Sequence, residues 1–328
     1  MDFNALLESA PNKNIFDSLL KARAMLEQHR KIAVSVSGGS DSDTIMDLLE
    51  LVKPENRELT CVFLDTALEF NSTKRHLDEL ERKYGVAIER RRAKVTVAAA
   101  CRIYGIPFIC KDVSGVIGRL QHHGFDWRDS FENAGKYGRC KSALEWYFDR
   151  RPPSKSGKSK FSIAKYSMLR DFIISSPPDF KISDKCCYYA KKVVAKDFER
   201  EYKPDLVVTG MRRAEGGRRT GSIQTCFSPS DGNSPDNYRP LWFWTDADKA
   251  TYKEWRGLRY SDCYEVWGLT RTGCVGCPCN SKAEPELEIV DQYEPQLVKA
   301  ARCIFGASYD YRRRYAEYKA AQKSWGCL

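Results

Sequence analysis

Histidine is scarce in this chain of 328 residues, which has four, at positions 29, 76, 122 and 123. His122 and His123 fall in LQHHGFDW, a stretch typical of a polar loop. Enzymes with an activated serine or cysteine nucleophile usually place a histidine beside it. No arrangement of that kind is recognisable in the sequence, which disfavours a hydrolase of this class.

Long apolar runs are also missing. No stretch approaches the roughly 18 apolar residues of a membrane span. The start, MDFNALLESAPNK, does not have the basic residues followed by an apolar segment that a secretory signal has. Hydrophobic residues still make up 42% of the chain and charged residues 30%. We therefore expect a cytoplasmic protein with a large core and no membrane partner.

Cysteine, in contrast, is abundant, with 13 residues. In a cytosolic protein of this size, clustered cysteines indicate metal or redox chemistry more often than disulfides. Cys186 and Cys187 form a tandem pair, and Cys274 and Cys277 form a later CxxC motif. Four thiolates from two such sites can hold Zn²⁺ or an iron–sulfur cluster. Buried cysteines without a metal are the remaining alternative.

Positive charge is in excess, with a formal net charge of +10. The excess is uneven, because residues 136–170 contain ten Lys and Arg against two Asp and Glu and include the stretch RPPSKSGKSK. A basic loop of this composition suits a polyanion such as nucleic acid. A solvated surface loop without a partner is the alternative.

Strand and helix patterns alternate along most of the chain. Helices are expected over about 14–29, Asp43–Val52, Ser72–Tyr84 with Ser72 as a candidate N-cap, and Cys187–Tyr202. Strands are expected at Lys31–Val36, Leu59–Thr66, 86–91 and Asp205–Gly210. Residues 94–185 are less regular, and the chain is helical again from about 280. The alternation predicts an α/β fold, a doubly wound, mostly parallel sheet, with a helical, cysteine-containing C-terminal part.

The stretch SGGSDS lies where the first predicted strand ends and a helix begins. Ligands of parallel α/β folds bind beyond such strand ends. Glycines let the backbone approach a ligand closely, and the helix presents N–H groups and its positive dipole end. The stretch is a candidate phosphate cradle, distinct from GxxxxGK[ST] because no lysine follows, and an ordinary turn is the alternative. Its residues are Ser37, Gly38, Gly39, Ser40, Asp41 and Ser42.

Charged residues near two other strand ends extend this candidate site. Asp65 ends the second predicted strand and could bind ribose or Mg²⁺, as could Asp41, with helix capping as the alternative. A group of arginines follows the last predicted strand, where guanidinium groups suit phosphate or sulfate. These are Arg212, Arg218 and Arg219, with Glu215 as a candidate anchor for one of them.

SGGxDS is the signature of the PP-loop ATP pyrophosphatases, and the chain resembles their branch that contains the phosphoadenosine phosphosulfate (PAPS) reductases. LDTALEF, Leu64–Phe70, is similar to the family's DTGxxF segment, with Ala67 replacing the glycine. TGMRRAEGGRRT, Thr209–Thr220, is similar to its GxRxxES segment, with Gly216 in the serine position. RPLWFWTDADKATY is similar to its PhxxWTxxDV segment. The resemblance extends from about Lys31 to Cys279.

This resemblance implies that the chain binds ATP with Mg²⁺, cleaves it between the α and β phosphates, and adenylates a substrate oxygen. The implied catalytic residues are Asp41, Ser42, Asp65, Arg212 and Arg218. The implied nucleotide contacts are the six residues of SGGSDS together with Asp65, Thr66, Gly210 and Arg212.

The cysteine pattern is similar to the [4Fe–4S] site of adenylylsulfate reductases, which pairs a tandem CC with a distant CxxC. RTGCVGC is also similar to the RxGCxxC segment of the DNA phosphorothioation sulfur-transfer enzyme. The resemblance implies that Cys186, Cys187, Cys274 and Cys277 bind a [4Fe–4S] cluster. Cys279 or Cys140 could replace one of them, so three or four bound cysteines are both open.

Three functions are compatible with these features. The favoured one is an ATP-dependent sulfurtransferase acting on nucleic acid, with a cysteine desulfurase as sulfur donor, because an intact SGGxDS suits cleavage of ATP. A reductase that makes sulfite from PAPS or adenylylsulfate is the second, although the end KSWGCL offers Cys327 without the Glu and His of the family's ECGxH-like tail. The third is a non-catalytic nucleotide-binding iron–sulfur protein in a defence complex.

The predicted organisation has three segments. An N-terminal helix occupies 1–30, and a PP-loop α/β domain occupies 31–270, with a basic insertion at about 111–181. Residues 271–328 form a cluster-binding segment and C-terminal helices. A homodimer and a larger complex are both compatible with this organisation, and the sulfur acceptor is not named by the sequence.

Overall fold

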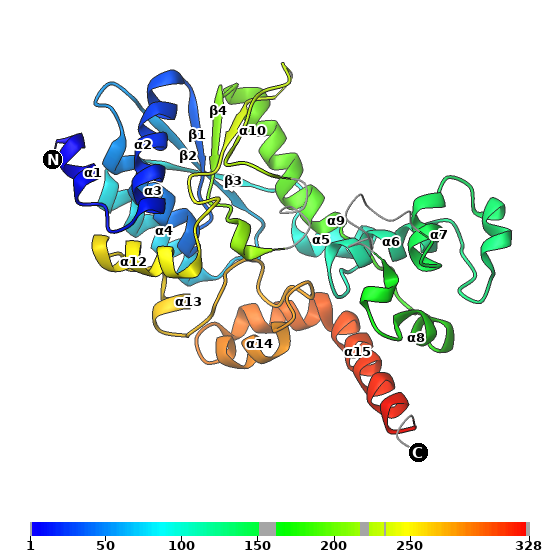
Figure 1. The fold of residues 1–328 in the computed structure, drawn as a ribbon. Coiled ribbons are helices and arrows are strands. Elements are labelled where there is room, and N and C mark those ends of the chain that lie inside the picture. Colours follow the sequence, from blue (N-terminus) through cyan, green and yellow to red (C-terminus); the bar gives the residue numbers. More distant parts are fainter. Residues whose placement is uncertain (1, 151–161, 217–222, 233, 326–328) are drawn as a thin grey trace. The chain divides into compact units, whose positions relative to one another are not determined.

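The computed structural model describes residues 2–150, 162–216, 223–232 and 234–325, with side chains up to 322. The chain divides into two compact units (Figure 1). We call Met1–Ala93 with Lys191–Cys274 the sheet unit, and Lys94–Ala190 with Val275–Leu328 the helical unit. The predicted 1–30 segment lies in the sheet unit, and the predicted insertion lies in the helical unit.

The sheet unit is built on a six-stranded sheet in the order β3-β2-β1-β4-β6-β5. All neighbouring strands are parallel except β5 and β6, which are antiparallel. The strands are β1 (Ile32–Ser35), β2 (Leu59–Asp65), β3 (Ile88–Arg92), β4 (Leu206–Thr209), β5 (Phe227–Ser228) and β6 (Asp236–Tyr238). The predicted fold class is therefore confirmed. Strands β5 and β6 were not predicted, because two or three residues are too few to show a periodic pattern.

Helices cover both faces of this sheet. Strand β1 is apolar because both of its faces are buried: Val34 packs in the core with Ile15 and Leu49, and Ala33 packs with Phe198. The helices are α1 (Phe3–Glu8), α2 (Lys13–Gln28), α3 (Ser40–Val52), α4 (Asn71–Tyr84), α10 (Val194–Tyr202), α12 (Asp246–Arg256) and α13 (Asp262–Glu265), with a 3₁₀ turn, η4 (Arg213–Glu215). Helix α12 begins with a capping box between Thr245 and Asp248.

Two helix starts differ from the prediction. Helix α3 begins at Ser40, three residues before the predicted Asp43, so part of SGGSDS forms its first turn. The N-cap of α4 is Phe70, and Ser72 lies within the helix, where its hydroxyl is 2.8 Å from the Cys263 sulfur. Ser72 is therefore not the N-cap, because a buried tertiary contact holds its side chain instead.

The helical unit has its own apolar core, to which Phe108, Trp146 and Tyr311 contribute. Residues 94–185 are therefore more regular than expected, because this core folds short segments that lack a long periodic pattern. The elements are α5 (Val97–Tyr104), α6 (Lys111–His122), η1 (Phe131–Tyr137), α7 (Lys141–Tyr147), η2 (Ile163–Lys165), α8 (Leu169–Ser175), α9 (Lys185–Cys187), α14 (Ala283–Asp291) and α15 (Pro295–Trp325). Within the predicted Cys187–Tyr202 helix, η3 (Tyr188–Val193) is a π-helix. Among the described residues, no helix has the length and apolarity to cross a membrane.

Candidate active site

The SGGSDS loop joins β1 to α3 and depends on close packing around its glycines. Gly38 has a φ of +63°, and a Cβ placed there would lie 2.6 Å from the Thr73 methyl group. Gly210, just after β4, approaches the loop from the next strand. A Cβ on Gly210 would lie 3.0 Å from the backbone carbonyl of Asp41. Only glycine fits either position without displacing its neighbours.

Hydroxyl groups hold the loop in shape from within. The Ser42 hydroxyl donates to the Gly39 carbonyl at 2.8 Å and accepts from Ser37 at 3.2 Å. The Thr44 hydroxyl donates to the Ser40 carbonyl at 2.8 Å. The first turn of a helix has N–H groups without intrahelical partners, so the start of α3 is preformed for an anion.

Two cations from other elements lie at the start of α3. The Asp41 carboxylate is 2.9 Å from Arg212 Nε and 2.9 Å from Lys249 Nζ. Lys249 also donates to the Ser40 hydroxyl at 2.7 Å, and Arg212 is 6% exposed and reaches Asp246 at 2.9 Å. The loop has no lysine of its own, but α12 supplies one. Sequence reasoning missed Lys249 because more than two hundred positions separate it from the loop.

Glu215 lies beside this cation group. Although the residue as a whole is exposed, its carboxyl end is desolvated, which together with the hydrogen bond to Asp41 raises the pKa of Glu215 to about 7. The Arg212 charge opposes this rise. A carboxyl group that titrates near neutrality can take up or release a proton at a reacting oxygen. The predicted Arg218, and Arg219 beside it, lie outside the described residues.

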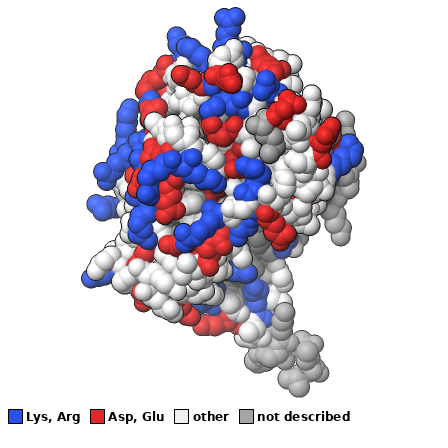
Figure 2. All heavy atoms as spheres, turned by 90° about the vertical axis from the view of Figure 1, so that its left-hand side faces the viewer, with Lys and Arg blue, Asp and Glu red and all other residues white. Residues whose placement is uncertain are grey.

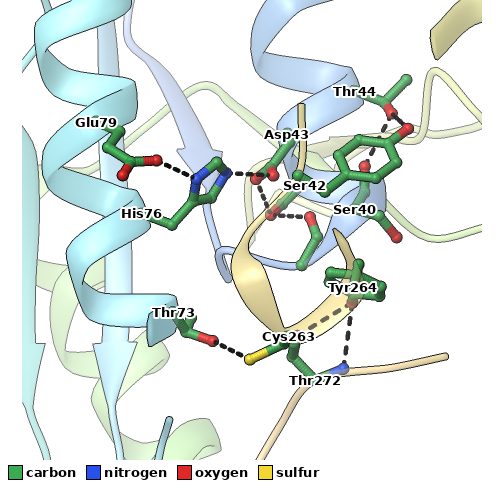
Figure 3. A network of polar contacts seen from close by, with 12 residues as sticks. Ser40, Ser42, Asp43, Thr44, Thr73, His76, Glu79, Cys263, Tyr264 and Thr272 are labelled. Carbon is green, nitrogen blue, oxygen red and sulfur yellow. Dashed lines mark hydrogen bonds and ion pairs between the residues drawn. The ribbon is translucent and has the colours of Figure 1, made fainter. Parts of the chain in front are cut away.

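A buried polar network supports the loop from α4 (Figure 3). His76 Nε2 is 2.7 Å from the Asp43 carboxylate, and His76 Nδ1 is 3.0 Å from Glu79. Asp43 in turn is 3.5 Å from the Ser42 hydroxyl. Burial raises the pKa of Asp43 against the opposing effect of His76. Burial alone lowers the pKa of His76, but Asp43 and Glu79 outweigh it and the pKa is raised.

Sequence reasoning also missed this network. The sequence offered two signals for it. Asp43 is the first residue of the predicted helix Asp43–Val52, and His76, one of only four histidines, lies in the next predicted helix. Another approach closes a further side of the loop: a Cβ on Gly39 would lie 3.0 Å from the Thr272 hydroxyl and 3.3 Å from the Tyr264 hydroxyl, which accepts from the Thr272 backbone N–H at 3.2 Å. The loop is thus held by α4 and by the segment after α13, as Figure 3 shows.

The end of β2 forms a second polar group. Asp65 accepts a hydrogen bond from the Ala67 N–H at 2.8 Å, and Ala67 keeps a left-handed φ of +65° in the position of the family's glycine. Thr66 is fully buried, and its hydroxyl donates to Glu69 at 2.6 Å. Burial raises the pKa of Glu69. The backbones of Cys274 and Glu69 form an isolated antiparallel β-bridge, and the Cys274 sulfur is 3.4 Å from the Thr66 hydroxyl.

Thiols gather in the helical unit. The pKa of the Cys186 thiol is raised, chiefly by its hydrogen bond with Cys101. The hydrogen bond between Cys186 and Cys187 lowers this pKa, and burial of Cys186 raises it further. The pKa of Cys187 is raised by its bond with Cys186 and by burial, and Lys111 opposes this. The hydrogen bond between the Cys279 and Cys277 thiols likewise raises the pKa of Cys279. Of the four predicted ligands, Cys186, Cys187 and Cys277 belong to this unit, and Cys274 belongs to the sheet unit.

The two spare thiols differ. Cys279 lies beside Cys277, whereas Cys140 packs in the helical core and donates to the Tyr137 carbonyl at 3.1 Å. Within the described residues, no group of three or more His, Cys, Asp or Glu is arranged to hold a single metal ion. A [4Fe–4S] cluster makes a different demand, because its thiolates bind separate irons and surround the cluster. The thiol-only donor set of the helical unit fits that chemistry.

Comparisons with known proteins find similarity in sequence and in fold. Residues 31–111 match the model of the phosphoadenosine phosphosulfate reductase domain, which confirms the resemblance over this part of the chain. An uncharacterised protein of Methanocaldococcus jannaschii is 35% identical over 78 residues, which are 24% of this chain and 16% of that protein. The chain thus matches about a sixth of that relative's length.

Three solved structures are similar in fold. The PAPS reductase of Candida auris is 13% identical, with 83% of this chain and 93% of that chain covered and a TM-score of 0.43. The FMN adenylyltransferase of Candida glabrata is 12% identical, with 84% and 68% covered and a TM-score of 0.42. The U34-tRNA thiolase NcsA of Methanococcus maripaludis, with its [4Fe-4S] cluster, is 15% identical, with 93% and 79% covered and a TM-score of 0.39.

Proposed function

Because residues 31–111 match the model of the PAPS reductase domain, we propose that this chain is an ATP-dependent sulfurtransferase. The observation that carries the proposal is the preformed SGGSDS loop with Lys249 and Arg212 at the start of α3. ATP with Mg²⁺ binds there, and an oxygen of the substrate attacks the α phosphate, so that pyrophosphate leaves and the oxygen carries AMP. Sulfur then takes the place of that oxygen, which departs with AMP.

The residues of the loop divide this work. The N–H groups at the start of α3, with Lys249 and Arg212, bind the phosphates and the negative charge that develops on them. Glu215, with a pKa of about 7, takes the proton from the attacking oxygen. Asp65, at the end of the neighbouring strand, binds the ribose, and the buried Thr66 beside it holds Glu69 rather than the nucleotide. Asp41 and Ser42, expected from the sequence to be catalytic, are proposed to position other groups: Asp41 holds Lys249, and Ser42 holds the loop.

The thiols supply the sulfur side of the reaction. We assign Cys186, Cys187, Cys274 and Cys277 to an iron–sulfur cluster, with Cys279 as the alternative to one of them. If only three of these thiols bind, the cluster would supply an open iron at which sulfur is held for transfer. A cysteine desulfurase is the proposed sulfur donor. The acceptor is proposed to be nucleic acid, since the chain carries an excess of ten positive charges.

The matched domain also favours a second candidate, reduction of an activated sulfate to sulfite. That reaction needs no cleavage of ATP, and its expected nucleophile, Cys327, lies outside the described residues. The two candidates therefore differ in whether ATP is converted to AMP and pyrophosphate.

The test is anaerobic purification of the full chain, followed by iron and sulfide analysis and an assay for AMP and pyrophosphate release from ATP. The proposal expects iron with sulfide, and ATP cleavage that Lys249→Met reduces at least tenfold, because a charge-assisted contact to phosphate is lost. Lys253→Met, on the same helix but paired with Glu265 at 2.8 Å, is the matched control. Sulfite formation without ATP cleavage would establish the reductase instead, and zinc in place of iron would overturn the cluster assignment.

A further inference from the structure

Three tyrosines form an aromatic surface on the helical unit. Tyr104 and Tyr189 stack with ring centroids 4.7 Å apart and planes 10° apart, and Tyr188 meets Tyr189 edge-on at 5.1 Å. Tyr104 is 37% exposed and Tyr188 is 41% exposed, and the neighbouring Ile103 is 56% exposed. We call Ile103, Tyr104, Tyr188 and Tyr189 the aromatic platform. Exposed apolar groups that cluster in this way usually mark a binding surface.

The fold produces this platform at the thiols. Tyr104 is the last residue of α5. In the same helix, the Cys101 thiol is hydrogen-bonded to the Cys186 thiol, and Tyr188 follows Cys187 directly in the chain. The helix that begins at Lys185 turns into the π-helix η3 at Tyr188. Such π-helical turns are rare and occur mostly at functional sites. The platform and the proposed cluster ligands therefore share one short stretch of chain.

The charge of the helical unit suits an anionic partner. This unit contains 25 Lys and Arg against 16 Asp and Glu, a net charge of +9 out of the chain's +10. The sheet unit contains 29 against 28, a net charge of +1, and on the face seen in Figure 2 the two signs are interspersed. On the platform, Lys185 Nζ lies 5.3 Å from the centre of the Tyr188 ring, and Arg102 is exposed beside Ile103.

We infer that the aromatic platform is a base-stacking site for single-stranded nucleic acid. The inference rests on the proposed sulfur transfer and names the surface that holds its substrate beside the thiols. Every base has a π face, so a tyrosine surface stacks single-stranded bases with little sequence preference. Lys185 and Arg102 neutralise the phosphates on either side. Paired bases cannot present these faces, so duplexes bind less tightly.

Each platform tyrosine should contribute measurably to binding. The experiment titrates the purified full chain with fluorescently labelled single-stranded RNA and DNA of mixed sequence and follows anisotropy. Tyr188→Ala and Tyr104→Ala should each weaken binding between about fivefold and a hundredfold, the range for loss of one stacked base. Tyr188→Trp should restore binding. Tyr293→Ala, which removes a tyrosine 45% exposed in the same unit, should leave binding unchanged.

Three results would overturn the inference. Unchanged binding in both alanine variants would mean that the nucleic acid binds elsewhere, and sulfur transfer would stand. Absence of nucleic-acid binding by the unaltered chain would remove the platform's ligand, while ATP cleavage would still decide the proposed enzyme class. Binding of ATP by each variant shows that it is folded. Loss of a desulfurase interaction alone in Tyr188→Ala would make the platform a protein surface and would also contradict the inference.

Discussion

A single histidine organises the interior behind the nucleotide loop. The side chains of His76 and Asp43 are 5% and 4% exposed, and the two meet at 2.7 Å. A buried carboxylate loses its hydration and keeps its charge only if a partner replaces the water. His76 is that partner. Asp43 in turn contacts the Ser42 hydroxyl, so His76 also fixes the position of the loop. Loop geometry at the phosphate site therefore depends on a residue that does not contact ligand.

We predict that His76→Gln destabilises the protein by about 1–3 kcal/mol just below pH 6.5, less than full removal of a buried ion-pair partner costs, because glutamine still donates a hydrogen bond. The pKa of His76 is raised above its ordinary 6.5 in the folded state. Its stabilising effect is then complete below pH 6.5 and is lost as the pH rises through the raised pKa. Urea unfolding of both proteins across this pH range measures the difference.

The control for this prediction is Glu79→Gln. The Glu79 side chain is 49% exposed, and an exposed partner contributes at most about 1 kcal/mol. A difference between His76→Gln and the unaltered protein that does not change with pH would mean that His76 packs in neutral form and does not pair with a charged Asp43.

At the scale of the element, the β1–α3 turn is defined by space as much as by backbone conformation. Gly38 and Gly85 have almost the same left-handed φ, +63° and +64°. Gly85 ends α4, and a Cβ there would meet nothing within 4 Å. A Cβ on Gly38 would meet the Thr73 methyl group at 2.6 Å. Comparing these two glycines therefore separates backbone strain from steric exclusion.

We predict that Gly85→Ala costs about 1 kcal/mol of stability, the price of a left-handed residue, and leaves ATP affinity unchanged. Gly38→Ala should cost more and weaken ATP binding at least tenfold, because the turn must shift away from Thr73. The double variant Gly38→Ala/Thr73→Ser removes the methyl group and should recover part of the loss. Calorimetric titration with ATP measures all three, and equal effects of the two single alanine variants would contradict the steric explanation.

Local sequence was enough to identify the turn but not its surroundings. SGGSDS is read from consecutive residues because a strand, two glycines and a helix start are local features. Lys249 and Tyr264 reach the same turn from distant segments, and their positions carry no local signal. The same holds for Ser72, which resembles an N-cap in sequence and is held instead by Cys263. Strands β1, β2 and β4 were predicted because each is a mostly apolar run, as buried strands are, whereas β5 and β6 are too short to detect.

At the scale of the whole molecule, charge is divided unequally between the two units. The sequence revealed the excess of basic residues at 136–170, and the described residues of that segment belong to the helical unit. The unit that holds ATP in our proposal is nearly neutral, since its 29 Lys and Arg are balanced by 28 Asp and Glu, and some of its cations are paired with carboxylates such as Asp41 and Asp47. Recognition of ATP is thus expected to depend on a few placed contacts, and recognition of nucleic acid on the summed field of the helical unit.

This division predicts different salt dependence for the two ligands. Counterion release should weaken single-strand binding with a logarithmic slope of about −0.7 per contacted phosphate, while ATP affinity changes much less. Lys136→Gln/Lys141→Gln, at exposed positions of the helical unit, should flatten the slope, and Lys13→Gln/Lys21→Gln, at exposed positions of the sheet unit, should not. Anisotropy titrations over a range of KCl concentrations measure the slopes. An equal flattening by both pairs would mean that net charge alone attracts the strand, because both pairs remove the same two charges.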